Sequence, residues 1–296
     1  MQLNYFLLDV FTDTQLSGNQ LAVVVNADHV SDELMQKIAR EFSLAETIFL
    51  TQPLIERHTA AARIFTPTKE LPFAGHPTVG ASVLLGLQQR ASAVRIEEKV
   101  GLITSVMDRI DRRTGQSHFK LPQLPEETGD ASANSAIADT LRISVDDVGC
   151  GNYQPARFSA GLEYTLIPVR NAEVLAQIQP ERRGWSETYG AHQSPIYVFT
   201  ETADELGIDF AARMFQPGLL FGEDTATGSA VASLIGLVAK SGAVQDGQKT
   251  YQVRQGREIG RPSHIEMQVG MSEGRLVHGG IGGKAVIVAE GKIDLT

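Results

Sequence analysis

Cysteine is almost absent from the 296-residue sequence, which contains Cys150 alone. A single cysteine cannot form a disulfide within the chain, and such usage fits a reducing compartment, so we expect a cytoplasmic protein. The seven histidines are dispersed, with no His-x-His or His-Glu-x-x-His pattern and no cysteine pair at metal-ligand spacing. The sequence therefore predicts no bound metal.

Long apolar runs and clustered positive charge are also lacking. No stretch approaches the roughly 20 apolar residues of a membrane-spanning helix, and the segment MQLNYFLLDVFT alternates like a strand rather than resembling a secretory signal. The net charge is −9, and the 26 lysine and arginine residues are scattered. Nucleic-acid binding depends on clustered basic side chains, so we expect neither nucleic acid nor a membrane as a partner.

Glycine is plentiful, with 28 residues, but it forms no phosphate-binding motif. No Gly-x-Gly-x-x-Gly follows a strand-like segment, and no Walker-type run ends in Gly-Lys-Ser. The glycines of VHGGIGGKAV, residues 277–286, lie between strand-like segments and predict a turn. The glycines therefore indicate turns rather than a phosphate-binding loop.

The sequence repeats one plan in its two halves. The segment ARIFTP, residues 62–67, returns as ARMFQP, residues 212–217, about half of the chain later. Each copy follows an apolar strand-like segment that ends in threonine, and each precedes a glycine that opens an apolar helix-like segment, Gly75 or Gly228. The same elements in the same order indicate two copies of one supersecondary unit.

The predicted fold class is α+β. It has two pseudo-symmetric lobes, each a mostly antiparallel sheet curled around a central apolar helix, the first of which is expected over residues 77–87. We expect residues 1–121 to form the first lobe and residues 122–296 the second, with the last strand, about residues 283–296, able to pack on the first lobe. The stretch 121–135, with its Pro, Glu, Ser and Ala residues, is expected to be the linker.

The segment PFAGHPTVGAS, residues 72–82, places Gly75 and His76 where the first apolar helix begins. A structural interpretation is that Pro77 favours a first helical turn, Gly75 tolerates unusual backbone angles and His76 fills a boundary position. A chemical interpretation is that backbone N–H groups at the helix start bind an anion. If the two halves face each other, both helix starts would hold a small anionic substrate in one cleft.

Five motifs resemble those of the phenazine-biosynthesis (PhzF-like) isomerase family: FTDTQLSGNQLAVV, EFSLAETIFL, RIFTPTKELPFAGHPTVGAS, FGEDTATGSA and RQGREIGRPS. The resemblance spans nearly the whole chain and implies a diaminopimelate epimerase-like fold, a homodimer and a metal- and cofactor-independent isomerase. Related racemases carry a catalytic cysteine just before the glycine of each helix. Ala74 and Thr227 stand at those positions here, so racemisation by two thiols is not expected.

By the same resemblance, Glu46 removes a proton from one carbon of a small anionic, cyclic or amino-acid-like metabolite and returns it to another. Apolar neighbours should shield the carboxyl group and favour its neutral form between the two steps. His76 and Asp224 match further catalytic positions, with substrate orientation or proton relay as their roles. The expected substrate-binding residues are Ser17, Asn19, Gly75, Gly228, Ser229, Gln255 and Gly256.

Each assignment has a simpler alternative. A glutamate that begins an apolar strand, as Glu46 does, is commonly an exposed edge residue, and Asp224 can complement a helix dipole. Ser17 and Asn19 are turn formers by nature. The protein can also be a non-catalytic module that binds a small anion or a protein in the same cleft. A third possibility, a cysteine-independent epimerase, would need Asp224 as a second base.

Overall fold

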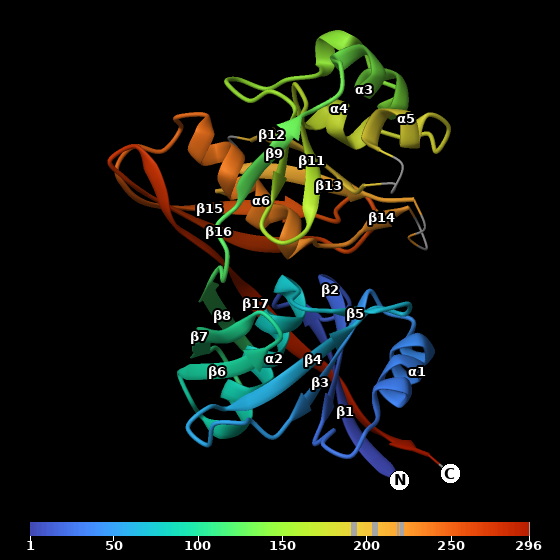
Figure 1. Cartoon of the computed structure of the whole chain (residues 1–296), viewed down its shortest axis with the longest axis vertical. Helices are drawn as coiled ribbons and strands as arrows, with labels where there is room; N and C mark the ends of the chain where they lie inside the picture. The colour runs from blue at the N-terminus through green and yellow to red at the C-terminus, as the bar shows by residue number, and fades with distance from the viewer. Residues whose placement is uncertain (191–193, 203–206, 218, 220–221, 296) are drawn as a thin grey trace. The chain divides into compact units, whose positions relative to one another are not determined.

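The computed structural model describes residues 1–190, 194–202, 207–217, 219 and 222–295. The chain divides into two compact units. Unit 1 comprises Met1–Pro122 with Gly282–Thr296, and unit 2 comprises Gln123–Ile281. Both units are rich in strands and each contains a long apolar helix, so the fold class is α+β (Figure 1).

Unit 1 is built on a closed ring of strands. Strands β1 and β2 are antiparallel, β2 and β3 parallel, β3 and β4 antiparallel, β4 and β6 parallel, and β6, β7 and β8 antiparallel. Strand β17 pairs with β1 on one side and with β8 on the other, which closes the sheet into a barrel. The strands are β1 (Gln2–Val10), β2 (Asn19–Val25), β3 (Glu46–Thr51), β4 (Ala60–Phe65), β5 (Glu70–Leu71), β6 (Ala93–Glu98), β7 (Gly101–Arg109), β8 (Thr114–Lys120) and, from Gly282 on, β17 (Arg275–Asp294).

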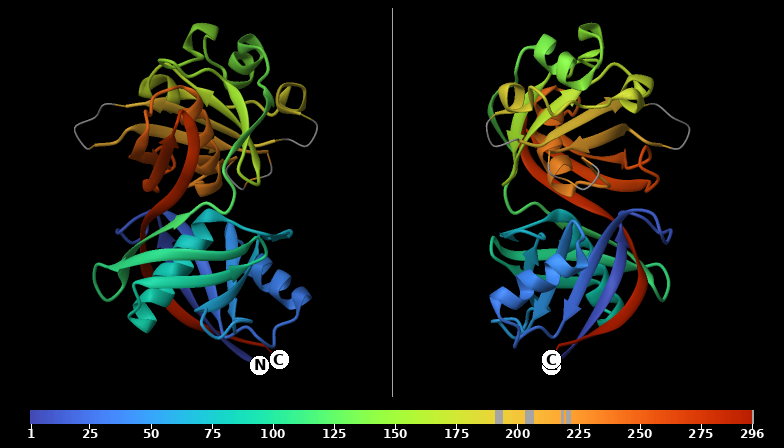
Figure 2. Two further views of the ribbon diagram at one scale, coloured as in Figure 1. Left: turned by 60° about the vertical axis from the view of Figure 1, so that its left-hand side comes forward. Right: turned by 90° about the vertical axis from the view of Figure 1, so that its right-hand side faces the viewer.

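Helix α2 (Gly75–Gln89) lies inside this barrel, as Figure 2 shows, and it packs against β1, β2, β3, β6, β7 and β8. Every residue from Gly75 to Leu87 is buried, which an all-round apolar helix requires. Gly80 lets a strand approach closely, because a Cβ there would lie 2.5 Å from a methyl carbon of Leu21. The helix predicted over residues 77–87 is confirmed, and it begins two residues earlier than expected.

Unit 2 repeats the order of strand pairing. Strands β10 and β11 are antiparallel, β11 and β12 parallel, β12 and β13 antiparallel, β13 and β15 parallel, and β15 and β16 antiparallel, as from β1 to β7 in unit 1. Helix α6 (Gly228–Lys240) packs against β10, β11 and β16. The strands are β9 (Glu126–Asp130), β10 (Ala156–Ser159), β11 (Glu163–Pro168), β12 (Ile196–Glu201), β13 (Phe210–Phe215), β14 (Glu223–Asp224), β15 (Gly247–Gln255), β16 (Ser263–Ser272) and the start of β17.

Smaller helices cover the outer faces of both sheets. In unit 1, α1 (Asp32–Phe42) turns Met35 and Ile38 onto a core that includes Phe49 and Phe65. In unit 2 the helical segments share a core with β12 and β13. These segments are α3 (Asn134–Leu141), a 3-10 turn (Val145–Asp147), α4 (Ala172–Gln177) and α5 (Trp185–Tyr189).

The repeated ARIFTP and ARMFQP segments form corresponding strands. Arg63 on β4 donates two hydrogen bonds to Glu70 on β5, at 2.8 and 2.9 Å. Arg213 on β13 donates two to Glu223 on β14, at 2.9 and 2.7 Å. The repetition in the sequence therefore places the same Arg–Glu pair in both units.

Two of the predicted connections are wrong. The stretch 121–135 is not only a linker, because β9 occupies Glu126–Asp130 and pairs with β10, and α3 begins at Asn134. The glycines of residues 277–286 do not form a turn, because β17 runs through them as one strand of 20 residues. A Cβ on Gly282 would lie 2.0 Å from the ring of His118, so glycine serves close packing here rather than a change of direction.

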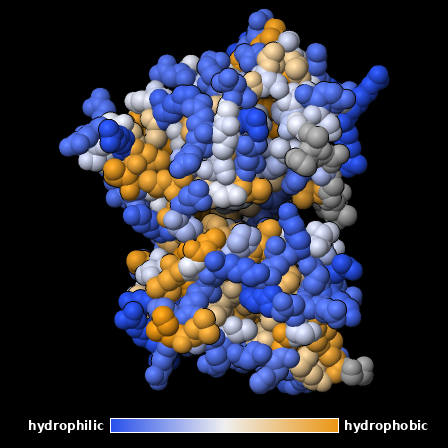
Figure 3. Space-filling model, in the orientation of Figure 1, coloured by the Kyte–Doolittle hydropathy of each residue, from blue (hydrophilic) through white to orange (hydrophobic). Residues whose placement is uncertain are grey.

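The large apolar side chains that remain exposed are spread along the chain, among them Leu16, Leu54 and Leu162 in connections and Val106 on β7. Figure 3 accordingly shows a face with much hydrophilic surface and separate apolar patches. Within the described ranges, none of the helices is long and apolar enough to cross a lipid bilayer.

Candidate active site

The start of α2 and the starts of β2 and β3 meet at one end of the unit 1 barrel. Strands β2 and β3 run in parallel with Leu21 opposite Glu46, so Gln20 comes beside that glutamate. His76, in the first turn of α2, places Nδ1 3.0 Å from Glu46 Oε2. Its Nε2 lies 3.3 Å from the carbonyl oxygen of Gln20. The structure thus brings together two of the three predicted catalytic residues, Glu46 and His76.

Glu46 is not the exposed edge residue of the simpler alternative. Strand β3 lies between β2 and β4, and the residues that follow Glu46, up to Leu50, are buried. The Glu46 side chain is 20% exposed and that of His76 is 4% exposed. The carboxyl group is therefore largely shielded by protein and still open to a small ligand.

Both ring nitrogens of His76 have oxygen atoms as neighbours. Both ring nitrogens face oxygen atoms that accept hydrogen bonds, Glu46 Oε2 and the Gln20 carbonyl. A neutral imidazole has one N–H group and can donate to only one of them. The Nδ1 contact places the imidazole where it can exchange a proton with the Glu46 carboxyl group, a geometry that general acid–base chemistry requires.

Ser17 and Asn19 lie in and just after the connection from β1 to β2. Asn19 is the first residue of β2 and is 4% exposed. The carboxylate of Asp9, on β1, accepts a hydrogen bond of 2.6 Å from the backbone N–H of Leu16, which holds this connection in place. Gly18 has a φ of 66°, which favours glycine. The turn-forming role of these residues is therefore compatible with a position of Asn19 beside the Glu46 strand.

The predicted polar residues of unit 2 form a hydrogen-bonded cluster at the start of α6. Thr227, just before Gly228, donates from its hydroxyl to Asp224 Oδ2 at 2.6 Å. Gln255, at the end of β15, accepts a bond of 3.1 Å from the backbone N–H of Thr227 and donates to the Asp224 carbonyl oxygen at 2.9 Å. Thr227 was not among the predicted site residues. Thr227 thus holds the Asp224 carboxylate in place.

Ser229 contacts a residue that sequence reasoning missed. Its hydroxyl lies 2.8 Å from the hydroxyl of Tyr164 on β11, and Tyr164 is 1% exposed. Burial, together with the charges of Tyr164 and Asp224, raises the pKa of the nearby Tyr197 well above its usual range. A buried tyrosine in a strand is an ordinary core residue, so the sequence contains no signal that singles out Tyr164.

Gly256 shapes the turn after Gln255. It has a φ of 77°, and a Cβ there would lie 2.5 Å from the carbonyl oxygens of Arg261 and Thr225. We expect Gly256→Ala to displace Gln255 and to lower the free energy of unfolding by about 1–3 kcal/mol. Chemical denaturation measures this loss. Gly260→Ala is the matched control, because Gly260 has a φ of 75° but no described atom within 4 Å of the added Cβ, and equal losses would contradict the role of close contact.

The helix start of unit 1 is suited to an anion rather than to a metal ion. Ala74, the residue that precedes α2, has no side-chain oxygen to cap the first backbone N–H groups. These groups and the helix dipole favour a negatively charged ligand. No group of three His, Cys, Asp or Glu side chains in the part of the chain that the structure describes is arranged to hold a metal.

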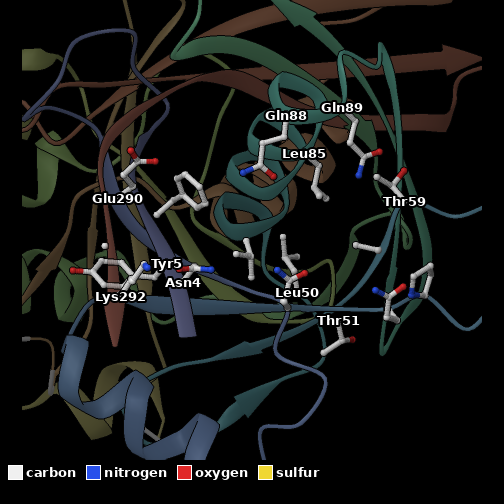
Figure 4. Close-up of a pocket in the computed structure, with 17 residues that line it drawn as sticks. Asn4, Tyr5, Leu50, Thr51, Thr59, Leu85, Gln88, Gln89, Glu290 and Lys292 are labelled. Atoms are coloured by element: carbon white, nitrogen blue, oxygen red, sulfur yellow. The ribbon is translucent and has the colours of Figure 1, made fainter. Parts of the chain in front are cut away.

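A separate cavity of about 750 Å³ lies at the other end of α2 (Figure 4). Leu85, Gln88 and Gln89 of the last turns of α2 line it, together with residues of β1 and β17 such as Asn4 and Glu290. None of the predicted site residues lines this cavity.

This chain belongs to the family of phenazine biosynthesis-like proteins, whose sequence profile matches residues 8–291. An uncharacterized isomerase from Mesorhizobium japonicum is 38% identical over 298 residues, which cover 98% of each chain. A trans-2,3-dihydro-3-hydroxyanthranilate isomerase from Pseudomonas fluorescens is 31% identical over 296 residues, 99% of each chain. The crystal structure of a PhzF-family phenazine biosynthesis protein from Bacillus anthracis superposes with a TM-score of 0.86 at 24% identity and covers 100% of both chains.

These comparisons confirm the family that the motifs indicated. The Bacillus anthracis structure shows that the α+β fold is shared along the whole chain. The relatives that are named isomerases support isomerase activity for this protein.

Proposed function

We propose that this protein moves a carbon-bound proton on a small anionic, cyclic or amino-acid-like substrate, with Glu46 as acid and base and without a metal or other cofactor. The observation that carries the proposal is the 3.0 Å contact between Glu46 and His76 at the start of α2. The isomerase names of the relatives support the class of reaction.

In the proposed reaction, the Glu46 carboxylate removes a proton from one carbon, and the electron pair of that C–H bond forms a new double bond. The existing double bond shifts, and the carbon at its far end takes a proton back from the Glu46 carboxylic acid. The substrate keeps its formula and Glu46 returns to its starting state, so no oxidant or reductant is consumed. One positioned acid–base group typically accelerates such a step by roughly 10²–10⁴-fold.

The other residues of unit 1 are proposed to bind and orient the substrate. Backbone N–H groups in the first turn of α2 would hold its carboxylate, and Gly75 leaves room for a close approach of that group. His76 orients Glu46 and stabilises whichever member of the pair carries the charge.

Unit 2 has its own helix start at Gly228 and Ser229, where an anionic group can bind by the same physics. The Asp224 carboxylate, held by Thr227 and Gln255, can accept a hydrogen bond from an amino or hydroxyl group.

The first compound to test is trans-2,3-dihydro-3-hydroxyanthranilate, because the relative from Pseudomonas fluorescens is named for isomerising it. This molecule is a small cyclic carboxylate with an amino and a hydroxyl group, and it can undergo the double-bond shift described above.

A panel of small carboxylic acids in deuterium oxide tests the proposal. The panel contains trans-2,3-dihydro-3-hydroxyanthranilate with other cyclic and amino-acid-like carboxylates, and proton NMR follows their C–H signals. We expect at least one acid to lose or relocate a single C–H signal when the wild-type protein is present, and none to do so without it. Binding of these acids without any change at carbon would contradict catalysis and would favour a non-catalytic binding module.

A further inference from the structure

Glu98 is a buried carboxyl group beside the first turn of α2 that the proposed reaction does not use. It is the last residue of β6 and is 8% exposed. Its Oε1 lies 2.7 Å from Thr78 Oγ1, and the same hydroxyl oxygen lies 2.8 Å from the carbonyl oxygen of Ala74. Its Oε2 is buried without a hydrogen-bond partner among the residues that the structure describes.

The hydrogen atoms in this row of contacts indicate the protonation state of Glu98. The Thr78 hydroxyl has one hydrogen, yet two oxygen atoms face it at hydrogen-bonding distance. A protonated Glu98 donates to Thr78, whose hydroxyl then donates to the Ala74 carbonyl, and both contacts are satisfied. An ionised Glu98 would compete with Ala74 for one hydrogen and would bury a charged oxygen without a partner, which is costly. The geometry therefore favours a neutral Glu98.

The charged groups around Glu98 have other partners. On β7, which pairs with β6, Asp108 and Arg109 lie exposed at the end of the strand that is remote from Glu98. The groups on β6, β4, α2 and the adjoining turn are engaged as follows: Glu97 with His58, Lys99 with Glu70, Arg63 with Glu70 and Asp32, and His76 with Glu46. Burial accordingly dominates and raises the pKa of Glu98 to about 8, although the hydrogen bond with Thr78 acts in the opposite direction.

We propose that Glu98, as a neutral acid, is a positioning residue that fixes the first turn of α2 through Thr78 and the Ala74 carbonyl. This inference rests on the proposed function, which assigns substrate binding to Gly75 and the orientation of Glu46 to His76 in that turn. Glu98 acts through the helix and does not touch the substrate. Loss of its proton at alkaline pH breaks the row of hydrogen bonds and loosens the helix start.

The direction of the pH dependence follows from the raised pKa. Folded Glu98 keeps its proton up to a pH of about 8, whereas a glutamate in the unfolded chain loses it near pH 4.5. The stabilisation from the neutral acid is complete below about pH 4.5 and is lost progressively as the pH rises to about 8. In Glu98→Gln an amide N–H group replaces the acid as donor to Thr78 and does not titrate. The stability of this variant should therefore not fall with rising pH in this way.

Hydrogen exchange of the ligand-free protein between pH 6 and pH 9 tests the inference, with rates corrected for intrinsic exchange. The probes are the amides of Thr78, which donates to the Ala74 carbonyl, and of Val79. We expect their protection to fall about tenfold across this range in the wild type and to stay constant in Glu98→Gln. Thr78→Val should lower protection at every pH, and Thr78→Ser should restore it. The same pH dependence in wild type and Glu98→Gln, or full protection in Thr78→Val, would overturn the role of Glu98.

Turnover of trans-2,3-dihydro-3-hydroxyanthranilate by the same variants separates this inference from the proposed function. If the wild type is inactive on the whole acid panel, the proposed function fails, and amide protection still decides the role of Glu98. If the wild type is active, its kcat/KM should fall near pH 8. The kcat/KM of Glu98→Gln should match that of the wild type within about twofold at pH 6 and should not fall near pH 8. An alkaline loss that persists unchanged in Glu98→Gln would overturn the positioning role.

Discussion

Glu46→Gln is expected to reduce turnover by roughly 10²–10⁴-fold, because a carboxamide cannot take a proton from carbon. The substitution preserves the shape of a side chain that is 20% exposed and in contact with His76, so the melting temperature should stay close to that of the wild type. Initial rates on trans-2,3-dihydro-3-hydroxyanthranilate, or on whichever acid of the panel reacts, measure the effect together with thermal unfolding.

Glu41→Gln is the matched control for this experiment. Glu41 is exposed on α1, and the same chemical change there should leave both turnover and melting temperature unaltered. A Glu46→Gln protein that turns over at the wild-type rate would exclude Glu46 as the acid and base. A folded Glu46→Gln protein that is inactive would support the assignment, provided that Glu41→Gln remains active.

Arg213→Met is expected to lower the free energy of unfolding by about 3–5 kcal/mol, the usual cost of removing one partner of a buried ion pair. The side chains of Arg213 and Glu223 are 9% and 4% exposed. Arg213 Nη1 also donates to the carbonyl oxygens of Leu175 and Ile178, at 3.0 and 2.9 Å. The substitution therefore leaves the buried charge of Glu223 unpaired and removes a donor from three carbonyl groups, those of Leu175, Ala176 and Ile178. Urea denaturation measures the loss.

The repeat supplies the control, because Arg63 is the counterpart of Arg213 in unit 1. The Arg63 side chain is 25% exposed and its partner Asp32 is 78% exposed, so water can solvate Asp32 after Arg63→Met. The other partner, Glu70, is 17% exposed but keeps its ion pair with Lys99. We expect a loss of about 1 kcal/mol for Arg63→Met, as for exposed ion pairs. A loss as large as that of Arg213→Met would show that burial does not determine the cost.

The central helices and their entry strands could be predicted from the sequence because the repeat appears twice. ARIFTP and ARMFQP mark β4 and β13, and a glycine-led apolar segment follows each of them. The continuous path of β17 could not be predicted in this way. Glycine favours turns in general, whereas Gly282 is required by the ring of His118, which belongs to a strand far away in the sequence.

The family resemblance predicts that Glu46 and His76 belong to one active site, but neither it nor residue spacing predicts their contact. This contact depends on the parallel pairing of β2 with β3 and on the depth of α2 in the barrel, which local patterns do not specify. Glu98 was missed although a signal exists: Val94, Ile96 and Glu98 alternate on the buried face of β6. The charged residues around Glu98 are typical of a solvent-exposed strand end, and only the surrounding barrel shows that the Glu98 carboxyl group is buried.

The most direct test follows the hydrogen that Glu46 is proposed to carry. The substrate is labelled with deuterium at the carbon that loses its proton, and NMR and mass spectrometry measure how fast the label leaves that carbon. We expect the label to leave during turnover by the wild type and by Glu41→Gln, and to stay in place with Glu46→Gln. Release of the label by Glu46→Gln at the wild-type rate would contradict the assignment of Glu46 as the proton carrier.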